Sequence, residues 1–483
     1  MILRRPYALT TIGSWSLVFL AAFESLAVTT IMPVVTADLD GRALYSLAFS
    51  ATLAASVIAM VIAGGWADGR GPAKPLLTAI ALFASGLAVA GLAPVMSVFI
   101  GGRFLQGLGA GGITVSLYVL VVKLYPADLH IKIFGAFASA WVLPSIVGPF
   151  AAGVIADALS WHWVFLGVLV LVAAATALVL PSLRQPRPAP HPAPPAAPHP
   201  DPRADPLPHA GPGPDLRPAS RLDPGHGPEP FLDAGRIRGA VLLAVAVVAL
   251  SYTADLDQRL AWAFAPVAVI VIAVAAKRLV PPGTYRARRG LPAAVLLCGA
   301  AGAVFFGTEV YLPLLLQDRY GLAAWLSGVT LTAAAVSWAL ASAVQARLGD
   351  RLSPVTALRT GAALLAAGAV TELIAATLHL PPLVVAAGWF LAGFGMGTLY
   401  PQISTLVLAY SEPGREGFNT SAKSITDAVG GSTSLALTGL IFATVTRAPF
   451  VGVLVFTSVI ALTVVALAGR AGSQERESAT ISS

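Results

Sequence analysis

Gly101-Gly102-Arg103-Phe104-Leu105-Gln106-Gly107-Leu108-Gly109-Ala110-Gly111-Gly112 places an arginine among glycines, inside an apolar run from about Ser97 to Val121. The run is long enough to cross a bilayer, which takes about 20 apolar residues of helix. An arginine within the hydrocarbon is costly unless it faces a polar interior or a partner, which makes it a functional candidate. The glycines remove side-chain bulk from one helix face, so that another helix can approach closely. The stretch therefore predicts a tightly packed helical bundle with a polar centre.

The composition of the chain is that of a protein with many membrane spans. Of its 483 residues, 57% are hydrophobic and 11% are charged, whereas soluble domains carry about 25% charged residues. Arg4 and Arg5 precede an apolar run, as in a signal peptide, but this run is too long, lacks a credible cleavage site and is followed by many similar segments. We therefore interpret it as the first span. The single cysteine, Cys298, excludes an intrachain disulfide.

Fourteen apolar segments are long enough to be spans, and together they predict an all-α membrane protein. They lie near 10–36, 45–66, 74–93, 97–121, 132–157, 162–182, 237–253, 262–280, 291–316, 327–347, 356–378, 383–410, 422–446 and 450–469. Because 237–253 is short, twelve spans with a re-entrant pair are the alternative. The expected organisation is an N-terminal six-helix half (1–182), a linker (183–236), two extra transmembrane helices with a basic loop (237–290), a C-terminal six-helix half (291–470) and a tail (471–483).

The segment 183–236 is dominated by proline, alanine, histidine, aspartate and arginine. Proline fixes its own backbone and lacks an amide donor, so we expect an extended cytoplasmic linker rather than a packed domain. Its histidines offer potential metal ligands, but their irregular spacing among prolines points to biased composition instead. We expect neither a metal site nor a cofactor.

The distribution of lysine and arginine predicts the orientation of the chain. If the N-terminus is cytoplasmic, the loops on that side hold most of the basic residues, and the opposite side holds only Arg42, Arg259, Arg319 and Arg447. This is the positive-inside bias of membrane proteins. It predicts a multi-pass protein of the cell membrane with both termini cytoplasmic, and it explains the net charge of +7 without a nucleic-acid partner.

Two stretches of the first half recur in the second half. Gly102–Gly109 aligns with Gly388–Gly395, and Ala67–Pro72 aligns with Gly349–Pro354. Repeated halves are typical of transporters that bind their substrate near the membrane midplane and rock one half against the other. The sequence therefore predicts a transporter architecture.

The repeat has one large departure, at Arg103, whose counterpart is Trp389. A residue needed only for packing symmetry would more often recur in both halves. We therefore interpret Arg103 as having a role that the second half lacks.

Four motifs follow one another in the order expected of a known family. They are Gly64-Gly65-Trp66-Ala67-Asp68-Gly69-Arg70-Gly71 after the second span, Arg103 with Gln106 and Gly107 in the fourth span, Gly135, Pro144, Gly148, Pro149 and Gly153 in the fifth span, and Trp161-His162-Trp163-Val164-Phe165 before the sixth. Together they resemble the major facilitator superfamily, specifically its fourteen-helix drug:proton antiporters. The resemblance covers nearly the whole chain apart from the linker and the tail, and it implies an extra helix pair inserted between two six-helix halves.

In the family, the motif after the second span acts as a conformational latch. Asp68, at the end of a helix, can hold basic groups or the amino end of a neighbouring helix. A helix cap combined with positive-inside anchoring is the alternative, because Gly69 and the pair Pro72-Ala73 replace basic residues of the family pattern. The latch residues implied by the resemblance are Asp68, Arg70, Gly71 and the repeat positions Asp350 and Arg351.

The motif of the fifth span marks exporters rather than importers in this family. Its small residues and Pro149 permit close packing and a kink where the two halves meet. The chain departs from the family pattern at Pro144 and Ala152, which replace glycines. The resemblance therefore implies export.

Glu24 lies nine residues before Pro33 in the first span, where the family pattern places an aspartate. Burial disfavours the charged form of a carboxylate, so that such a group can bind and release protons. Glu24 is the leading candidate for proton coupling, and binding of a cationic substrate is a compatible second role. The alternative is that Glu24 is a structural carboxylate, permanently paired with another group. We interpret Arg103 as a neighbour that favours ionised Glu24 and so promotes proton release. If the two lie far apart, Arg103 becomes a hydrogen-bond hub for the first helix.

Three further acidic residues lie within apolar spans. Glu309 is either a cavity carboxylate or a residue near the outer mouth. Asp427 has either a transport role or a local ion pair with Lys423, one turn earlier. Glu372 falls in the outer part of a span that packs peripherally in the family. Several aromatic residues are candidates to line an apolar substrate cavity together with Glu24. They are Tyr118, Tyr311, Trp389 and Tyr400. Packing or lipid-facing roles are the alternative, because such roles are common for aromatic side chains in membrane helices.

These features predict a proton-coupled exporter of lipophilic or amphipathic small molecules, of the multidrug efflux type, that works by alternating access. Glu24, Arg103, Glu309 and Asp427 are the residues assigned to proton coupling. Export of an endogenous lipid or metabolite by the same mechanism is the alternative. A nutrient symporter would leave the fifth-span motif unexplained, and a membrane enzyme would need a catalytic constellation that the loops lack. We expect a monomer whose partners are its substrate, protons and the lipid bilayer.

Overall fold

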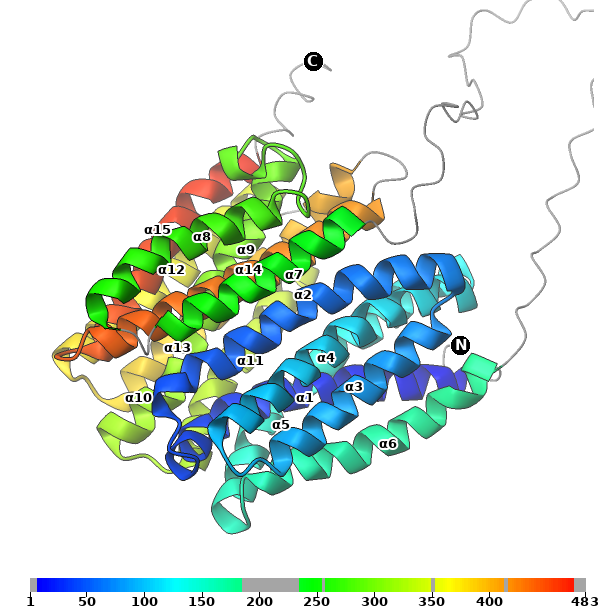
Figure 1. Cartoon of the computed structure of the whole chain (residues 1–483). Coiled ribbons are helices and arrows are strands. Elements are labelled where there is room, and N and C mark those ends of the chain that lie inside the picture. The colour runs from blue at the N-terminus through cyan, green and yellow to red at the C-terminus, as the bar shows by residue number, and fades with distance from the viewer. Residues whose placement is uncertain (1–6, 185–233, 254–256, 349–351, 412–415, 473–483) are drawn as a thin grey trace, which may run out of the picture.

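The computed structural model describes residues 7–184, 234–253, 257–348, 352–411 and 416–472, and within these ranges the ordered elements are all helices (Figure 1). Thirteen helical segments there are long and apolar enough to cross a membrane, and α5, which bends along its length, brings the number to fourteen. The predicted all-α membrane architecture is confirmed. Most of the predicted linker and nearly all of the predicted tail lie outside the described residues.

The N-terminal half consists of six helices joined by short connections. They are α1 (Ala8–Asp38), α2 (Tyr45–Arg70), α3 (Ala73–Gly91), α4 (Met96–Leu124), α5 (Ala127–Ala158) and α6 (His162–Arg184). The helix α5 contains Pro144 and Pro149 in its interior. Because proline removes a backbone donor and clashes with the preceding turn, its presence explains why this helix bends.

The C-terminal half has the same number of spans, the first of which is broken. Its helices are α9 (Leu291–Glu309), α10 (Tyr311–Tyr320), α11 (Ala324–Leu348), α12 (Pro354–Leu378), α13 (Pro382–Ala409), α14 (Glu416–Thr444) and α15 (Pro449–Ala471). The segments α9 and α10 follow each other as one span of 30 residues. The extra pair, α7 (Ala234–Tyr252) and α8 (Gln258–Ala276), precedes this half, and a loop containing the short helix η3 (Thr284–Arg286) leads from α8 to α9.

The two halves are built on the same helix pairings. In the first half α4 packs against α2 and α3, and α1 packs against α5 and α6; in the second half α13 packs against α11 and α12, and α9 packs against α14 and α15. Glycines of the two repeated stretches make equivalent contacts, with Gly109 of α4 on Phe83 of α3, and Gly395 of α13 on Leu365 of α12. The repeat inferred from sequence is therefore present in the packing.

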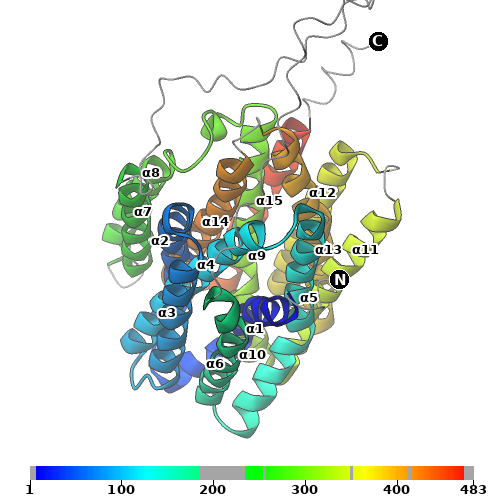
Figure 2. The ribbon, with the colours of Figure 1, turned by 90° about the vertical axis from the view of Figure 1, so that its right-hand side faces the viewer.

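The halves meet along two lines, α2 with α14 and α5 with α11. In Figures 1 and 2 the extra helices α7 and α8 lie together on one flank of the bundle, beside α2 and α14. Apolar residues of α2, α7, α8 and α14 form one shared cluster, and the hydroxyls of Ser50 and Ser251 share a hydrogen bond of 2.8 Å between α2 and α7. The inserted pair is therefore attached to both halves.

Candidate functional site

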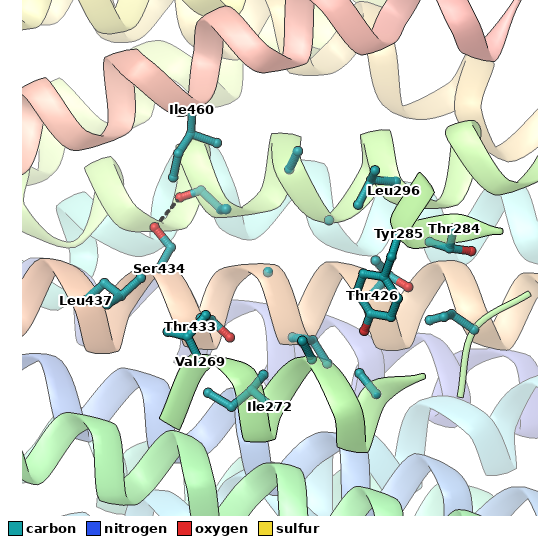
Figure 3. A pocket seen from close by; sticks show the side chains of 18 of the residues that line it. Val269, Ile272, Thr284, Tyr285, Leu296, Thr426, Thr433, Ser434, Leu437 and Ile460 are labelled. Carbon is teal, nitrogen blue, oxygen red and sulfur yellow. Dashed lines mark hydrogen bonds between the residues drawn. The ribbon is translucent and has the colours of Figure 1, made fainter. Parts of the chain in front are cut away.

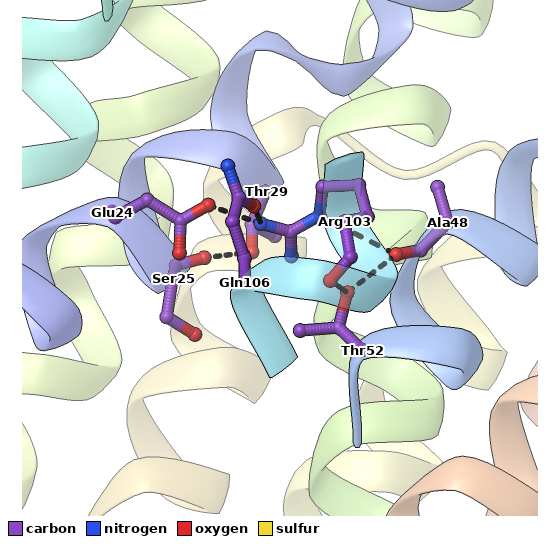
Figure 4. Close-up of polar contacts among 7 residues, drawn as sticks. All are labelled: Glu24, Ser25, Thr29, Ala48, Thr52, Arg103 and Gln106. Atoms are coloured by element: carbon purple, nitrogen blue, oxygen red, sulfur yellow. Dashed lines mark hydrogen bonds and ion pairs between the residues drawn. The ribbon is translucent and has the colours of Figure 1, made fainter. Parts of the chain in front are cut away.

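The N-terminal half contains a buried ion pair between Glu24 of α1 and Arg103 of α4 (Figure 4). Each of the two residues is only 3% exposed. Glu24 lies near the middle of α1 (Ala8–Asp38), which is the depth at which transporters with repeated halves bind their substrates. The structure thus brings together the two residues that the sequence singled out, while their role in proton coupling stays a prediction.

Arg103 also connects α4 to α2. Its Nη1 donates to Oε1 of Gln106 at 2.6 Å, and its Nε donates to the carbonyl oxygen of Ala48 at 3.4 Å. The carbonyl oxygen of Arg103 in turn accepts from Oγ1 of Thr52 at 3.1 Å. Gly107 makes this approach possible, since a Cβ there would collide with the backbone of Thr52. The arginine and the glycines of this stretch therefore serve one helix contact.

Gln106 has a spare donor beside the ion pair. Its Oε1 accepts from Arg103, but its Nε2 has no hydrogen-bond partner among the described residues, although the side chain is 0% exposed. Buried polar groups are almost always hydrogen-bonded to protein or to ordered water. This donor is therefore available to a water molecule or to a polar atom of a substrate next to Glu24.

The equivalent place in the C-terminal half holds an aromatic stack. Trp389 is 1% exposed and stacks on Phe305 of α9, with ring centroids 4.5 Å apart and planes inclined by 25°. Its Nε1 donates to the carbonyl oxygen of Leu331 on α11 at 3.3 Å, much as Arg103 donates to α2. The two halves thus repeat the helix contact, but the charged pair of the first half is replaced by two rings in the second.

A further polar cluster, partly buried, joins α9, α13 and α14. Asp427 of α14 interacts with the hydroxyl of Tyr400 on α13 and with the charge of Lys423, and Cys298 of α9 lies beside Tyr400. The ammonium of Lys423 lies over the ring of Tyr400, 4.5 Å from its centroid, and the described ion pairs do not include Lys423 with Asp427. Oδ1 of Asp427 has no hydrogen-bond partner in the described part of the chain. Asp427 therefore keeps an open acceptor oxygen, while its role in proton coupling stays a prediction.

Glu309 and Glu372 belong to helices of the C-terminal half, whereas Glu24 and Arg103 belong to the N-terminal half. Glu309 is 7% exposed at the last position of α9, where the span breaks before α10. Glu372 is 0% exposed between α12 and α13, and its Cγ lies 2.8 Å from where a Cβ on Gly388 would stand. Neither carboxylate oxygen of Glu372 finds a hydrogen-bond partner among the described residues. The two acidic side chains are thus both buried, at different helix contacts.

The motif of the fifth span lies where the halves touch. A Cβ added to Gly153 of α5 would stand 2.6 Å from Cα of Trp325 on α11, and one added to Gly328 of α11 would stand 2.7 Å from the carbonyl carbon of Pro149. Such a close approach of two backbones is what the small residues predict, whereas the link of this motif to export stays a prediction. The remaining motif residues, Gly135, Pro144 and Gly148, belong to the same helix.

Polar contacts join the two halves at one end of the bundle. They are the ion pair of Arg42 with Asp318, the hydrogen bond of 2.6 Å from Tyr45 Oη to the carbonyl oxygen of Val310, and that of 3.3 Å from Gln317 Nε2 to the carbonyl oxygen of Thr30. All of them lie near the end at which α1 finishes and α2 begins, opposite to the basic loops. Sequence reasoning missed these residues, because nothing in the local pattern of either segment reveals a partner in the other half.

The structure describes the predicted latch in part. Arg70 ends α2, and Gly71 follows with a φ of +84°, a backbone conformation that favours glycine at a helix end. Nζ of Lys123 on α4 donates to the carbonyl oxygen of Ala67 at 2.9 Å and so holds the end of α2 against α4. The side chain of Asp68 and the whole of Asp350 and Arg351 lie outside the described residues.

The aromatic residues predicted to line a cavity lie in several places. Tyr311 is buried against the rings of Tyr45 and Phe442, with centroids 5.7 and 5.2 Å away. Tyr118 is 47% exposed and meets Phe137 edge to face, at 6.2 Å between centroids. Trp389 and Tyr400 are connected in the C-terminal half through the rings of Phe305 and Trp338. That the four aromatic residues line a substrate cavity stays a prediction.

Two repeated halves, an inserted helix pair and a charged pair buried at mid-depth define a membrane transporter. Comparison with known proteins gives the same class. The profile of the Major Facilitator Superfamily matches residues 14–386, which is most of the chain. The chain therefore belongs to the Major Facilitator Superfamily, and it is a transporter rather than an enzyme.

The relatives that it resembles include efflux transporters. The multidrug transporter protein MdtP of Bacillus subtilis is 26% identical over 432 residues, which cover 88% of this chain and 73% of the relative. The MFS efflux transporter aclA of Aspergillus oryzae is 36% identical over 148 residues, 30% of this chain and 27% of the relative. The fungal alignments thus span about a third or less of those relatives' lengths. These similarities agree with the drug-efflux branch that the motifs resemble.

Solved structures confirm the fold. The crystal structure of an auto-inhibited POT family peptide transporter superposes with a TM-score of 0.62 at 19% sequence identity, over 95% of this chain and 97% of that chain. The human organic anion transporter MFSD10 (TETRAN) gives a TM-score of 0.59 at 16% identity, over 96% and 100% of the two chains. At these identities the likeness shows the shared fold alone.

Proposed function

We propose that the protein is a proton-coupled exporter of lipophilic or amphipathic small molecules that works by alternating access in the cell membrane, as a monomer with both termini cytoplasmic. The observation that carries the proposal is the buried Glu24–Arg103 ion pair. An ionisable pair in the interior of a span is rare and marks substrate paths and proton relays in transporters. The efflux names of the relatives support the direction and the substrate class.

A proton arriving from outside would neutralise Glu24 and leave the charge of Arg103 without its counter-ion. Removing one partner of a buried ion pair is strongly unfavourable, because the remaining charge is uncompensated. The arginine would then depend on its neutral partners, Gln106 and the carbonyl oxygen of Ala48 on α2. The protonated protein therefore favours an arrangement in which the guanidinium is better solvated.

The contacts of Arg103 would connect protonation of Glu24 to the interface between the halves. Arg103 forms hydrogen bonds with Ala48 and Thr52 of α2, and α2 packs directly against α14 of the other half. A change in the position of the guanidinium thus acts on the helix that meets the C-terminal half. Asp427 also lies on α14, so this helix carries a partly buried acidic group of its own.

We assign the structure to one of the two states that alternating access would require. Its halves are joined at the end opposite to the basic loops, by the ion pair of Arg42 with Asp318 and its neighbours. With the basic loops placed on the cytoplasmic side by the positive-inside bias, this would be the state closed towards the outside. Transport would require these contacts to separate, and Gly153 and Gly328 to move away from their close contacts with Trp325 and Pro149.

The residues at the end of α2 are the proposed latch for the opposite state. Asp68, Arg70 and Gly71 would then act with the repeat positions Asp350 and Arg351 at the cytoplasmic side. Gly71 supports this role, since its positive φ ends α2 sharply before α3 begins.

A reconstituted transport assay tests the proposed function. The purified full chain is placed in proteoliposomes with a pH-sensitive dye inside, a pH gradient is imposed, and a panel of lipophilic cations and neutral amphiphiles is added. Hydrophilic solutes such as sugars and amino acids are added in parallel as a comparison set. We expect at least one lipophilic or amphipathic compound to move against its gradient while protons move in the opposite direction. Downhill substrate movement without any dependence on the pH gradient would overturn proton coupling, and movement of only the hydrophilic solutes would overturn the substrate class.

A further inference from the structure

Two adjoining pockets lie beside the inserted helix pair, away from the Glu24–Arg103 site. The first has a volume of about 260 Å³ and lies between α8, α9, α14 and α15 (Figure 3). The second, of about 690 Å³, lies between the last turns of α8 and the loop that contains η3. They share the lining residues Ala273, Val280, Thr284 and Tyr285. The two pockets therefore adjoin along these residues, and we call them together the α8 groove.

The first part of the α8 groove has the apolar lining and the length that a lipid chain needs. Its lining includes Val269, Ile272 and Ala276 of α8 and Leu296 of α9. The opposite wall follows α14 from Thr426 to Leu437, about 16 Å at 1.5 Å per residue. That length is close to the roughly 15 Å that one leaflet contributes to a hydrocarbon core of about 30 Å. This part of the groove therefore matches one leaflet in length.

The second part of the groove is basic. Its lining includes Lys277, Arg286 and Arg288 and contains no acidic side chain. Within the described part of the chain, none of these three cations takes part in an ion pair. Basic pockets between transmembrane helices, at the membrane surface, are recognition sites for anionic lipid headgroups. Three uncompensated positive charges at the end of an apolar groove call for an occupant with a negative head and an apolar tail.

The loop that carries Arg286 and Arg288 has a defined backbone. Gly283 has a φ of +89°, and the side chain of Arg288 packs over it, with Cδ 2.7 Å from where a Cβ would stand. Oγ1 of the buried Thr284 donates to the carbonyl oxygen of Pro281 at 2.7 Å. The amide of Gly290 donates to the carbonyl oxygen of Arg470 at the end of α15, at 3.3 Å. The loop is therefore a built structure tied to the C-terminal half.

We propose that the α8 groove is a binding site for an anionic phospholipid. One acyl chain lies between α8 and the helices α9, α14 and α15, and the phosphate headgroup binds Lys277, Arg286 and Arg288. The lipid fills the space between the inserted helix pair and the C-terminal half, on the flank where α14 meets α2. A neutral lipid would leave the three cations unused, and a free phosphate ion would leave the apolar part unused.

Native mass spectrometry of the purified full chain tests this site. The protein in detergent is titrated with phosphatidylglycerol, with phosphatidylcholine of the same acyl chains, and with inorganic phosphate. The double substitution Arg286→Gln/Arg288→Gln removes two headgroup contacts and should weaken binding of phosphatidylglycerol about thirtyfold, given roughly 1 kcal/mol for each basic residue at an anionic membrane surface. The matched control Arg278→Gln/Arg289→Gln removes the same charge from the same loop, outside both pockets, and should leave binding unchanged.

A second substitution tests the apolar part of the groove. Ala273→Trp fills the junction of the two pockets and should also weaken phosphatidylglycerol binding, with Ala273→Leu as a smaller change if the tryptophan variant does not elute as a single species. Equal binding of the two lipids, or equal losses in the Arg286/Arg288 and Arg278/Arg289 variants, would overturn the headgroup site. Unchanged binding in both Ala273 variants, or full competition by inorganic phosphate, would show a surface anion site and overturn the proposal.

Discussion

Replacing Glu24 by glutamine removes a charge from the centre of the N-terminal half while keeping the size of the side chain. Glu24 and Arg103 are each 3% exposed, so the arginine would be left as an uncompensated buried cation. Breaking one side of such a pair costs about 3–5 kcal/mol, of which the retained amide–guanidinium hydrogen bond recovers about 1 kcal/mol. We therefore expect E24Q to be destabilised by about 2–4 kcal/mol. In E24Q/R103Q both charges are absent, so this variant should be more stable than E24Q alone.

Transport should respond in a different way from stability. In proteoliposomes the unmodified protein should export its substrate faster when a pH gradient is imposed. E24Q lacks the carboxylate that would take up and release the proton, so its export rate should be the same with and without the gradient. Downhill exchange of substrate at equal pH should persist, because it needs no net proton movement. The unfolding measurement and the two transport assays are made on the same preparation.

The matched control is E372Q, which makes the same chemical change at another buried carboxylate, between α12 and α13. It should keep the response to the pH gradient. If folded E24Q were still driven by the gradient as strongly as the unmodified protein, Glu24 would not be the coupling residue. If E24Q were as stable as the unmodified protein, or E24Q/R103Q less stable than E24Q, the buried-charge argument would be refuted.

Three further predictions follow from helix contacts. G107A should lower the free energy of unfolding by about 1–3 kcal/mol, because its Cβ meets the backbone of α2. The Cβ of G101A, on the same helix, meets nothing within 4 Å, so this variant should be neutral or stabilised by up to about 1 kcal/mol. Thermal unfolding of the two variants measures the difference, and equal losses of stability would contradict the prediction. R42C/D318C joined by a short thiol-reactive linker should stop transport by holding the halves together, each single variant should stay active, and transport through the linked protein would contradict the proposed state. E372M should raise the free energy of unfolding by about 1–3 kcal/mol, since it removes a buried carboxyl group without hydrogen-bond partners among the described residues. It should keep its transport activity, and loss of transport would instead show that this carboxylate takes part.

Much of the architecture could be read from the sequence because it depends on local properties. A span is recognised by its length and apolarity, and all fourteen expected segments coincide with helices of the structure. The repeat was visible in the glycines because close helix contacts tolerate no side chain, and the same glycines make those contacts in both halves. Arg103 and Glu24 stood out because a charge within the hydrocarbon requires a reason.

The pairing of helices could not be read in the same way. A membrane helix is apolar on the side that faces lipid and on the side that faces its neighbours, so its periodicity does not say which side is inside. The sequence therefore left open whether Glu24 contacts Arg103, and it gave no sign that Arg42 meets Asp318 or that Tyr45 bonds to Val310. These contacts depend on the rotation and crossing of helices far apart in the chain.

The sequence by itself determined a bundle of fourteen spans in two related halves, with an arginine and a glutamate buried near its centre. Only the tertiary structure decided that these two charges pair, that Trp389 replaces the pair with an aromatic stack in the other half, and that the inserted helices leave a groove with a basic end. The physical reason is the range of the interactions. Burial of apolar length acts on each segment separately, whereas an ion pair, a ring stack or a groove exists only once several helices have taken their places.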